Sequence, residues 1–435
     1  MVRRTSKAPR IEAPHSAEEN RTMIRGTSIL DLPPELLHMI FAYRRKDWVR
    51  SKREYANVCR KLRDVAVEYL DFKNPQVNDL DHFMGFMRRH GPLTKTVQSL
   101  HLFNVHLDAT LVLEIRQLFP NLTSLTLSDI VCNPPSPYNH PQSDPPETPL
   151  PESLKELEDL KIDCRRARAD SGWSLTGLMH ILSLLSTKKL LIWMHDGMCF
   201  RDKFDPSCLA GTSAVQNLHV LISQIPKKSM ANVMNALSVT LAPDVLQGVE
   251  VEYDSKPTLR ALSSLLDRIG GNVTNLSIYP LVRWTLEERQ KWTDPFDDWT
   301  LLDIRACKKL ESLHLPIYVR PKENLKPQRP LSHIAVGLLA NYAAPTLQEI
   351  IIDVHDLERP TTLGNRTVLR LQEFDKVVTQ ARFPNLQRFA VCVTPTRTLW
   401  NKANCNETCL AAIHRALPGL RARGILILSF KRWHW

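Results

Sequence analysis

The stretch Phe119-Pro120-Asn121-Leu122-Thr123-Ser124-Leu125-Thr126-Leu127 decides the fold class of this 435-residue chain. Its second half follows the pattern apolar-x-x-apolar-x-apolar, and the last two apolar residues alternate with polar ones, as in a strand with one buried face. Far along the chain, Phe383-Pro384-Asn385-Leu386 leads into the same pattern. Further copies begin at Val97, Leu157, Val215, Leu246, Val273, Leu310 and Leu347, with looser copies at Leu190-Ile192 and Ile425-Ile427. The copies recur about every 32 residues, which indicates an internal repeat.

Helical patterns separate these strand patterns. They span residues 108–118, 176–185, 259–268, 334–342, 369–380 and 407–417. Strand, loop and helix in repeated order predict an α/β fold with parallel strands inside and helices outside, which resembles an irregular leucine-rich-repeat solenoid. An open, doubly wound α/β sheet also alternates strand and helix. The recurring leucine phasing, together with the lack of a Gly-rich strand-to-helix turn, favours the solenoid.

A different motif lies near the N-terminus, in Leu32-Pro33-Pro34-Glu35-Leu36-Leu37-His38-Met39-Ile40-Phe41. Its later apolar residues fall on one face at helical spacing, and a second helical stripe runs from Tyr55 to Tyr69. This order of residues resembles the F-box, the helical adaptor-binding module of SCF-type ubiquitin ligases. The resemblance implies adaptor contacts from Leu32, Pro33, Glu35, Leu36, Leu37, Ile40, Phe41, Val58, Cys59 and Leu62. Leu62 stands where the family commonly has Trp, so a large aromatic ring is missing from that helix face.

An ordinary helical cap is the alternative interpretation of this segment, because Leu-Pro-x-Glu is common at helix starts. The second cluster, Val58-Cys59-Arg60, follows at the distance that the family expects and favours the F-box. A helical unit this small has too little interior to bury all its apolar side chains. We therefore expect some of them to remain available to a partner.

The predicted organisation follows from these motifs. It comprises a disordered tail over residues 1–27, an F-box-like helical domain over 28–74, a linker or helical cap over 75–95, and the solenoid over 96–435. Eight prolines in residues 133–152 cannot sit inside a helix or sheet and predict a disordered insertion. The segment from Trp284 to Trp299 is interpreted as an inserted helix or an aromatic anchor patch, and the tail from Phe430 to Trp435 as a cap on the last repeat.

Composition limits the choice of partners and compartment. The 57 Lys and Arg exceed the 46 Asp and Glu by a net charge of +11, which is too dilute over this length to indicate nucleic acid. No stretch has the pattern of a secretory signal or a membrane span, so we expect no membrane association. The nine cysteines are an odd number and widely scattered, which is typical of buried thiols in a reducing compartment. We expect a protein of the cytoplasm, the nucleus or both.

Motifs for catalysis and metal binding are missing from the sequence. No Walker-type phosphate loop, Gly-x-Ser-x-Gly elbow or His-Glu-x-x-His occurs. Cys405 and Cys409 with His414 lack a fourth zinc ligand, and on a helix His414 would point away from Cys405. His355, beside Asp353, is interpreted as part of a polar loop after a strand. We therefore expect no catalytic residue, no metal and no cofactor.

An F-box resemblance followed by a leucine-rich solenoid looks like a substrate receptor of an SCF-type cullin-RING ubiquitin ligase. The resemblance implies that the helical module docks on a Skp-family adaptor, and through it on a cullin, while the solenoid holds an unknown target protein. Such a receptor acts by proximity and is not itself an enzyme. A leucine-rich-repeat scaffold for protein–protein interaction, outside any ligase, is the alternative. The strand register predicts target contacts on the concave side from His101, Phe103, Lys161, Asp163, Trp193, His219, Glu250, Glu252, Tyr279, His314, Asp353 and Arg388.

Overall fold

The structure is a computed structural model, which describes residues 72–132, 156–164, 173–195, 200–222, 229–253, 255–280, 301–319, 332–342, 344–400 and 404–431. The chain divides into two compact units, Met1–Asp71 and Phe72–Trp435, and every described residue belongs to the second unit. The F-box-like motif, the proline-rich insertion, the segment from Trp284 to Trp299 and the last four residues lie outside the described residues.

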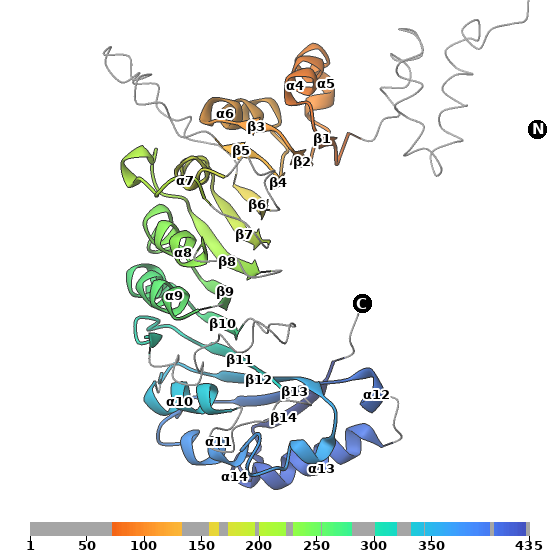
Figure 1. The fold of residues 1–435 in the computed structure, drawn as a ribbon, viewed down its shortest axis with the longest axis vertical. Coiled ribbons are helices and arrows are strands. Elements are labelled where there is room, and N and C mark those ends of the chain that lie inside the picture. The colour runs from red at the N-terminus through yellow and green to blue at the C-terminus, as the bar shows by residue number, and fades with distance from the viewer. Residues whose placement is uncertain are drawn as a thin grey trace, which may run out of the picture. The chain divides into compact units, whose positions relative to one another are not determined.

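The second unit is an α/β structure built on one large parallel sheet (Figure 1). Its twelve strands are β1 (Gln76–Val77), β2 (Ser99–Phe103), β4 (Ser124–Ser128), β6 (Leu157–Cys164), β7 (Thr187–Met194), β8 (Val215–Ile222), β9 (Gly248–Tyr253), β10 (Asn275–Pro280), β11 (Ser312–Tyr318), β12 (Glu349–Leu357), β13 (Arg388–Pro395) and β14 (Leu426–Phe430). Consecutive members of this sheet pair in parallel in chain order, with β1 and β14 at its two edges. This one-way order has no reversal point of the kind that defines a doubly wound sheet. A separate two-stranded sheet joins β3 (His106–Leu107) and β5 (Val131–Cys132).

Helices connect most of the strands. They are α4 (Leu80–Arg89), α5 (Gly91–Thr94), α6 (Ala109–Leu118), α7 (Leu175–Ser183), α8 (Ser229–Thr240), α9 (Lys256–Ile269), α10 (His333–Asn341), α11 (Gln372–Val377), α12 (Arg397–Trp400), α13 (Cys405–Ala416) and α14 (Pro418–Ala422). Crossovers between parallel strands are almost always right-handed, so a one-way strand order places successive helices on the same face of the sheet. Figure 1 shows α6, α7, α8 and α9 along one side, and α8 packs on both α7 and α9. We call the opposite side of the sheet the open face.

Capping side chains fix where several of these helices begin. Asp108 accepts a hydrogen bond from the Leu111 backbone N–H at 2.9 Å, and Ser174 caps Gly177 in the same way. Ser255 does so for Thr258 at the start of α9. Each cap satisfies an N–H group that has no partner inside its helix, which is worth roughly 1 kcal/mol.

The leucine pattern forms the core on the helix side of the sheet. Leu100 lies beside Leu125, and Leu125 beside Leu160, in continuous lateral rows. A second row joins Leu102, Leu127, Ile162, Ile192, Val220 and Val251. All these side chains are buried, and burial of each stabilises the fold by about 1.5–3 kcal/mol. The sequence-predicted buried pair is confirmed in these strands.

Asparagines in the turns before several strands link one repeat to the preceding one. Asn121 donates its side-chain N–H to the Lys95 carbonyl at 2.7 Å, and Asn385 donates to the Pro345 carbonyl at 2.8 Å. Asn272 makes the equivalent bond to Asp244. The Pro-Asn-Leu links therefore have a physical role, since they satisfy backbone carbonyls in the preceding turn.

Two sequence-based predictions about element positions are wrong in detail. The register between β13 and β14 places Leu426 and Leu428 in line with the core rows, whereas the looser repeat copy used Ile425 and Ile427. Ile427 is 41% exposed. Residues 425–428 are all apolar, so either alternate pair could form the buried face. The pattern alone therefore does not predict which pair is buried. The helix expected over 369–380 is limited to α11, because turns occupy the residues around it.

Candidate functional site

The open face carries the residues that alternate with the core rows. One row joins His101, Thr126, Lys161, Leu191, His219, Glu250, Ser277, His314 and Ile351 across neighbouring strands. A second row includes Phe103, Asp163 and Trp193, and further along it Glu252 lies beside Tyr279. The register thus puts all twelve predicted contact residues on one face of the sheet. Their role in binding stays a prediction.

The predicted residues differ in accessibility on this face. Phe103 is 41% exposed and Arg388 is also exposed, whereas most of the others are half-buried. Asp163 and Asp353 are buried. The two buried carboxylates mark two polar groups on the open face, one in its N-terminal part and one in its C-terminal part.

The Trp193 group comprises Lys161, Asp163, Trp193 and His195. The Lys161 ammonium lies 5.0 Å from the centroid of the Trp193 ring, and this ring stacks on the His195 imidazole at 5.3 Å. His195 Nε2 lies 2.9 Å from Asp163 Oδ1. The group therefore presents a large aromatic plane that two side chains hold in place.

The Asp353 cluster comprises Tyr279, His314, Tyr318, Asp353, His355 and Lys431. Lys431 Nζ donates a hydrogen bond to Asp353 Oδ2 at 2.5 Å. His314 Nε2 lies 3.5 Å and His355 Nε2 lies 3.7 Å from the same oxygen.

Two tyrosine rings complete this cluster. Tyr279 contacts the His314 ring edge-on, with its hydroxyl 3.0 Å from His314 Nδ1. Tyr318 stacks on His355 with 4.7 Å between ring centroids. Strands β10, β11 and β12 thus supply neighbouring side chains, and residue 431, just after β14, supplies the cation.

The carboxylate of Asp353 is stabilised in its charged form. Burial alone would raise its pKa, but the approach of His314, His355 and Lys431 outweighs burial and lowers the pKa below its ordinary value. Burial lowers the pKa of His355 despite the nearby Asp353, so this ring favours its neutral form. The Asp353 cluster therefore keeps a buried negative charge at neutral pH.

Further carboxylates lie around the tyrosines. Burial raises the pKa of Tyr279, and the charges of Glu250 and Asp353 add to this shift. Burial likewise raises the pKa of Tyr318, with added contributions from Glu252, Asp353 and Asp356. The carboxylates thus add to the effect of burial, because a negative neighbour opposes ionisation of a phenol.

A histidine–glutamate pair borders the Asp353 cluster. His219 Nδ1 lies 2.6 Å from Glu250 Oε2. This hydrogen bond lowers the pKa of Glu250 against the opposing effect of burial. On the other side of the cluster, Arg388 of β13 and Glu349 of β12 form an ion pair at 3.0 Å. Most charged groups of the open face are thus engaged with a neighbour before any partner binds.

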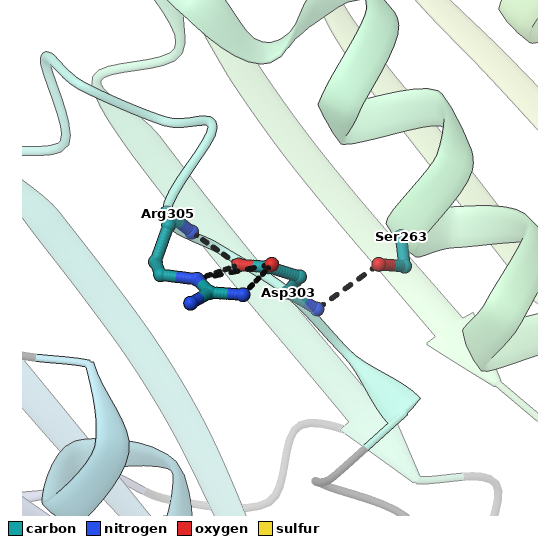
Figure 2. A network of polar contacts seen from close by, with 3 residues as sticks. All are labelled: Ser263, Asp303 and Arg305. Carbon is teal, nitrogen blue, oxygen red and sulfur yellow. Dashed lines mark hydrogen bonds and ion pairs between the residues drawn. The ribbon is translucent and has the colours of Figure 1, made fainter.

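The loop that leads into β11 is fastened to a neighbouring helix. The Asp303 backbone N–H donates to Ser263 Oγ of α9 at 3.0 Å, and the Arg305 guanidinium donates to both oxygens of the Asp303 carboxylate (Figure 2). Arg305 also lies over the Tyr342 ring, with 5.7 Å to its centroid. These contacts connect the loop ahead of β11 to α9 and to Tyr342.

Several members of the two groups were missed in the sequence. The interpretation of His355 as part of a polar loop is wrong, because β12 runs on to Leu357 and His355 is one of its strand residues. His195 lies two residues beyond Trp193 and Tyr318 lies four residues beyond His314, so an extension of the two-residue period would have found both. Lys431 reaches Asp353 from 78 residues away, and no local pattern contains that contact.

The described residues also include cysteines and possible metal ligands. The seven cysteines in the described part of the chain are free thiols, and all but Cys208 are buried, in agreement with the predicted buried thiols. Burial raises the pKa of Cys409 to about 12. Among the described residues, no three His, Cys, Asp or Glu side chains are grouped so that they could hold a metal ion.

Comparison with known proteins adds no assignment. No family model matches the chain, and no curated protein is similar enough to match. In the described residues, no helix is long and apolar enough to cross a membrane. Function is therefore inferred from the sequence motif and from the chemistry of the open face, which offers aromatic planes, hydrogen-bonding imidazoles and charges of both signs.

Proposed function

We propose that this chain is the substrate-recognition subunit of an SCF-type cullin-RING ubiquitin ligase. The observation that carries the proposal is the order of two features. An F-box-like motif at Leu32 to Phe41 precedes a parallel sheet whose strands follow one another in chain order, with polar and aromatic side chains on the face opposite the core rows. The F-box-like segment would bind a Skp-family adaptor, and the open face would bind the target protein.

Regularity along the sheet supports its finer interpretation as a leucine-rich-repeat solenoid. The core rows stay in register from Leu100 to Phe389, and Asn121, Asn272 and Asn385 make the same kind of link to the preceding turn. Units that contact mainly their neighbours are what a solenoid requires. Stacking of such units extends the open face with every repeat.

The chemistry of the open face supports a protein as its ligand. Aromatic residues and arginine are enriched where proteins bind one another, and Trp193, Tyr279 and Tyr318 are half-buried rings with an accessible part. Charges of both signs occur on the face, whereas a nucleic-acid surface would be predominantly basic. We therefore place the target, whose identity is unknown, on the open face.

The mechanism that follows is catalysis by proximity. A bound target is held near a ubiquitin carrier recruited through the adaptor and cullin, so the effective concentration of its lysines rises. The receptor contributes binding energy and geometry and needs no nucleophile, metal or cofactor of its own. Such a receptor needs only a binding surface, and the open face offers one through its paired polar groups and aromatic rings.

Recovery of partners from cells of the host tests the proposal. The full chain should bring down a Skp-family adaptor and a cullin, and the double change Leu36→Asp with Leu37→Asp should abolish that recovery by placing charge in the apolar docking helix. Asp353→Asn is the matched control, because it changes the open face and should leave adaptor recovery intact. If the wild-type chain recovers no adaptor, the ligase proposal is rejected.

One observation favours a second candidate. Leu62 replaces the aromatic residue that F-box proteins commonly carry at this position, which would weaken adaptor docking. A leucine-rich-repeat scaffold without a ligase would still bind a partner through the open face. Recovery of a partner that depends on Trp193, without any adaptor or cullin, would identify this scaffold.

A further inference from the structure

The partners of the buried Asp353 carboxylate all approach the same one of its two oxygens. Its side chain is 3% exposed, and Lys431 and the two histidines all approach Oδ2. The other oxygen, Oδ1, is buried without a hydrogen-bond partner. A buried carboxylate oxygen is normally satisfied, because an unmatched polar atom is costly inside a protein. Oδ1 can therefore still accept a hydrogen bond from a further donor.

Lysine is a poor match for such a carboxylate. Its ammonium is a compact point charge, and Lys431 donates to one oxygen only. A guanidinium has a planar fork of N–H groups that can donate to both oxygens of a carboxylate at once. An arginine side chain at this position would use Oδ1 as well as Oδ2.

The surroundings of Asp353 also fit a guanidinium. Planar cations stack on aromatic faces, and the stacked Tyr318 and His355 rings and the Tyr279 ring all belong to the cluster. Glu250 and Glu252 add negative charge around the tyrosines. The combination of a buried carboxylate, aromatic planes and neighbouring acidic side chains disfavours an anion and favours a positively charged planar group.

Lys431 is placed so that it could be displaced. Its side chain is 51% exposed although its partner is buried, so its stem and ammonium remain accessible to water. It follows β14, an edge strand whose side chains are all at least partly exposed. A half-exposed ion pair is typically worth little, so its loss on displacement is readily offset by the two hydrogen bonds of an arginine.

We propose that the Asp353 cluster is a binding site for an arginine side chain of the target protein, and that Lys431 occupies this site in the unbound protein. The incoming guanidinium replaces the Lys431 ammonium, donates to both oxygens of Asp353 and stacks against the neighbouring rings. The inference rests on the proposed function only in taking the open face as the target-binding surface. The site itself can be tested on the purified chain.

The test uses the full chain and two blocked tripeptides, acetyl-Gly-Arg-Gly-amide and its citrulline counterpart. Citrulline has nearly the shape of arginine without the charge. The reporters are the ring resonances of His314 and His355 in histidine-labelled protein, assigned through His→Gln variants. We expect the arginine peptide to shift both resonances saturably, with a dissociation constant on the order of millimolar for so small a ligand. The citrulline peptide should produce little shift.

Three variants make the test specific. Asp353→Asn should abolish the response to arginine, and Lys431→Ala should strengthen binding about fivefold, because it removes an internal competitor. Lys188→Ala is the matched control: it removes a half-exposed lysine that pairs with Glu158, outside the Asp353 cluster, and should leave the affinity within twofold. Equal responses to arginine and citrulline, or a Lys431→Ala variant that binds no better than wild type, would overturn the proposal.

The outcomes separate this site from the ligase proposal. Arginine binding without adaptor recovery would reject the ligase and leave the site standing. Adaptor recovery without arginine binding would reject the site and leave the ligase standing. Tighter binding of a lysine peptide than of the arginine peptide would contradict the bidentate geometry.

Discussion

Adjacent substitutions in β6 test the register that defines the open face. Leu160 is 1% exposed and lies between Leu125 and Leu190 in a core row, whereas Lys161 belongs to the open face and contacts the Trp193 ring. The two residues are neighbours in sequence but point to opposite faces of the sheet. Their replacement by alanine should therefore have very different consequences.

The expected magnitudes follow from what each side chain contacts. Leu160→Ala removes a fully buried side chain and leaves a cavity between two strands, which should lower the free energy of unfolding by about 3–5 kcal/mol. Lys161→Ala removes one cation–π contact at a half-exposed position, which should cost about 0.5–1 kcal/mol. A shift of register by one residue would exchange these two values.

Urea denaturation of the full-length variants, followed by circular dichroism, measures the difference. The midpoint for Leu160→Ala should fall clearly below that of wild type, and the midpoint for Lys161→Ala should stay close to it. If Lys161→Ala destabilises the protein as much as Leu160→Ala does, the assignment of the open face is wrong. The arginine site and the target-binding surface would then lose their structural basis.

Three further predictions concern the open face and the links between repeats. Alanine at Trp193 or Tyr279 should reduce target capture more than the free energy of unfolding, and equal losses of both would reject these residues as target contacts. Asn385→Ala should cost about 0.5–1.5 kcal/mol in urea denaturation because the Pro345 carbonyl loses its donor, whereas Asn341→Ala, which removes a bond within one helix, should cost less. Burial lowers the pKa of His355 below the 6.5 of the unfolded chain. As the pH falls, His355 therefore takes up a proton in the unfolded chain before it does so in the folded protein. The contribution of His355 to the free energy of unfolding should be complete above pH 6.5 and fall as the pH drops toward the lowered pKa. His355→Gln should flatten that fall in urea midpoints measured between pH 7 and pH 5, and an unchanged slope would contradict the burial of a neutral ring.

The buried face of a strand was predictable wherever apolar and polar residues alternate along it. Leu100 and Leu102 alternate with the polar His101 and predict one buried face, which the structure confirms. The last strand has no such signature, since residues 425–428 are apolar throughout and both parities satisfy the hydrophobic pattern. Its register is set by pairing with β13, after a turn at Gly424 with a positive φ of 71°.

The candidate site was predictable only in part, for a related reason. Asp353, His314 and Tyr279 follow from the two-residue period of their own strands. Lys431 joins them through a contact between distant parts of the chain, and such contacts are not encoded in a local pattern. The F-box-like segment lies outside the described residues, so its adaptor contacts stay predictions from the motif.

The most direct test of the central claim combines both proposed surfaces in one reconstituted assay. The purified chain would be mixed with the Skp-family adaptor, cullin and RING subunit of its host, with a ubiquitin-charged carrier enzyme and with a target captured on the open face. Transfer of ubiquitin from the carrier to that target would be measured. We predict transfer by the wild-type chain, loss of transfer with adaptor binding kept for Trp193→Ala, and loss of both for Leu36→Asp with Leu37→Asp. Undiminished transfer by both variants, or no association of the wild-type chain with the adaptor, would contradict the account.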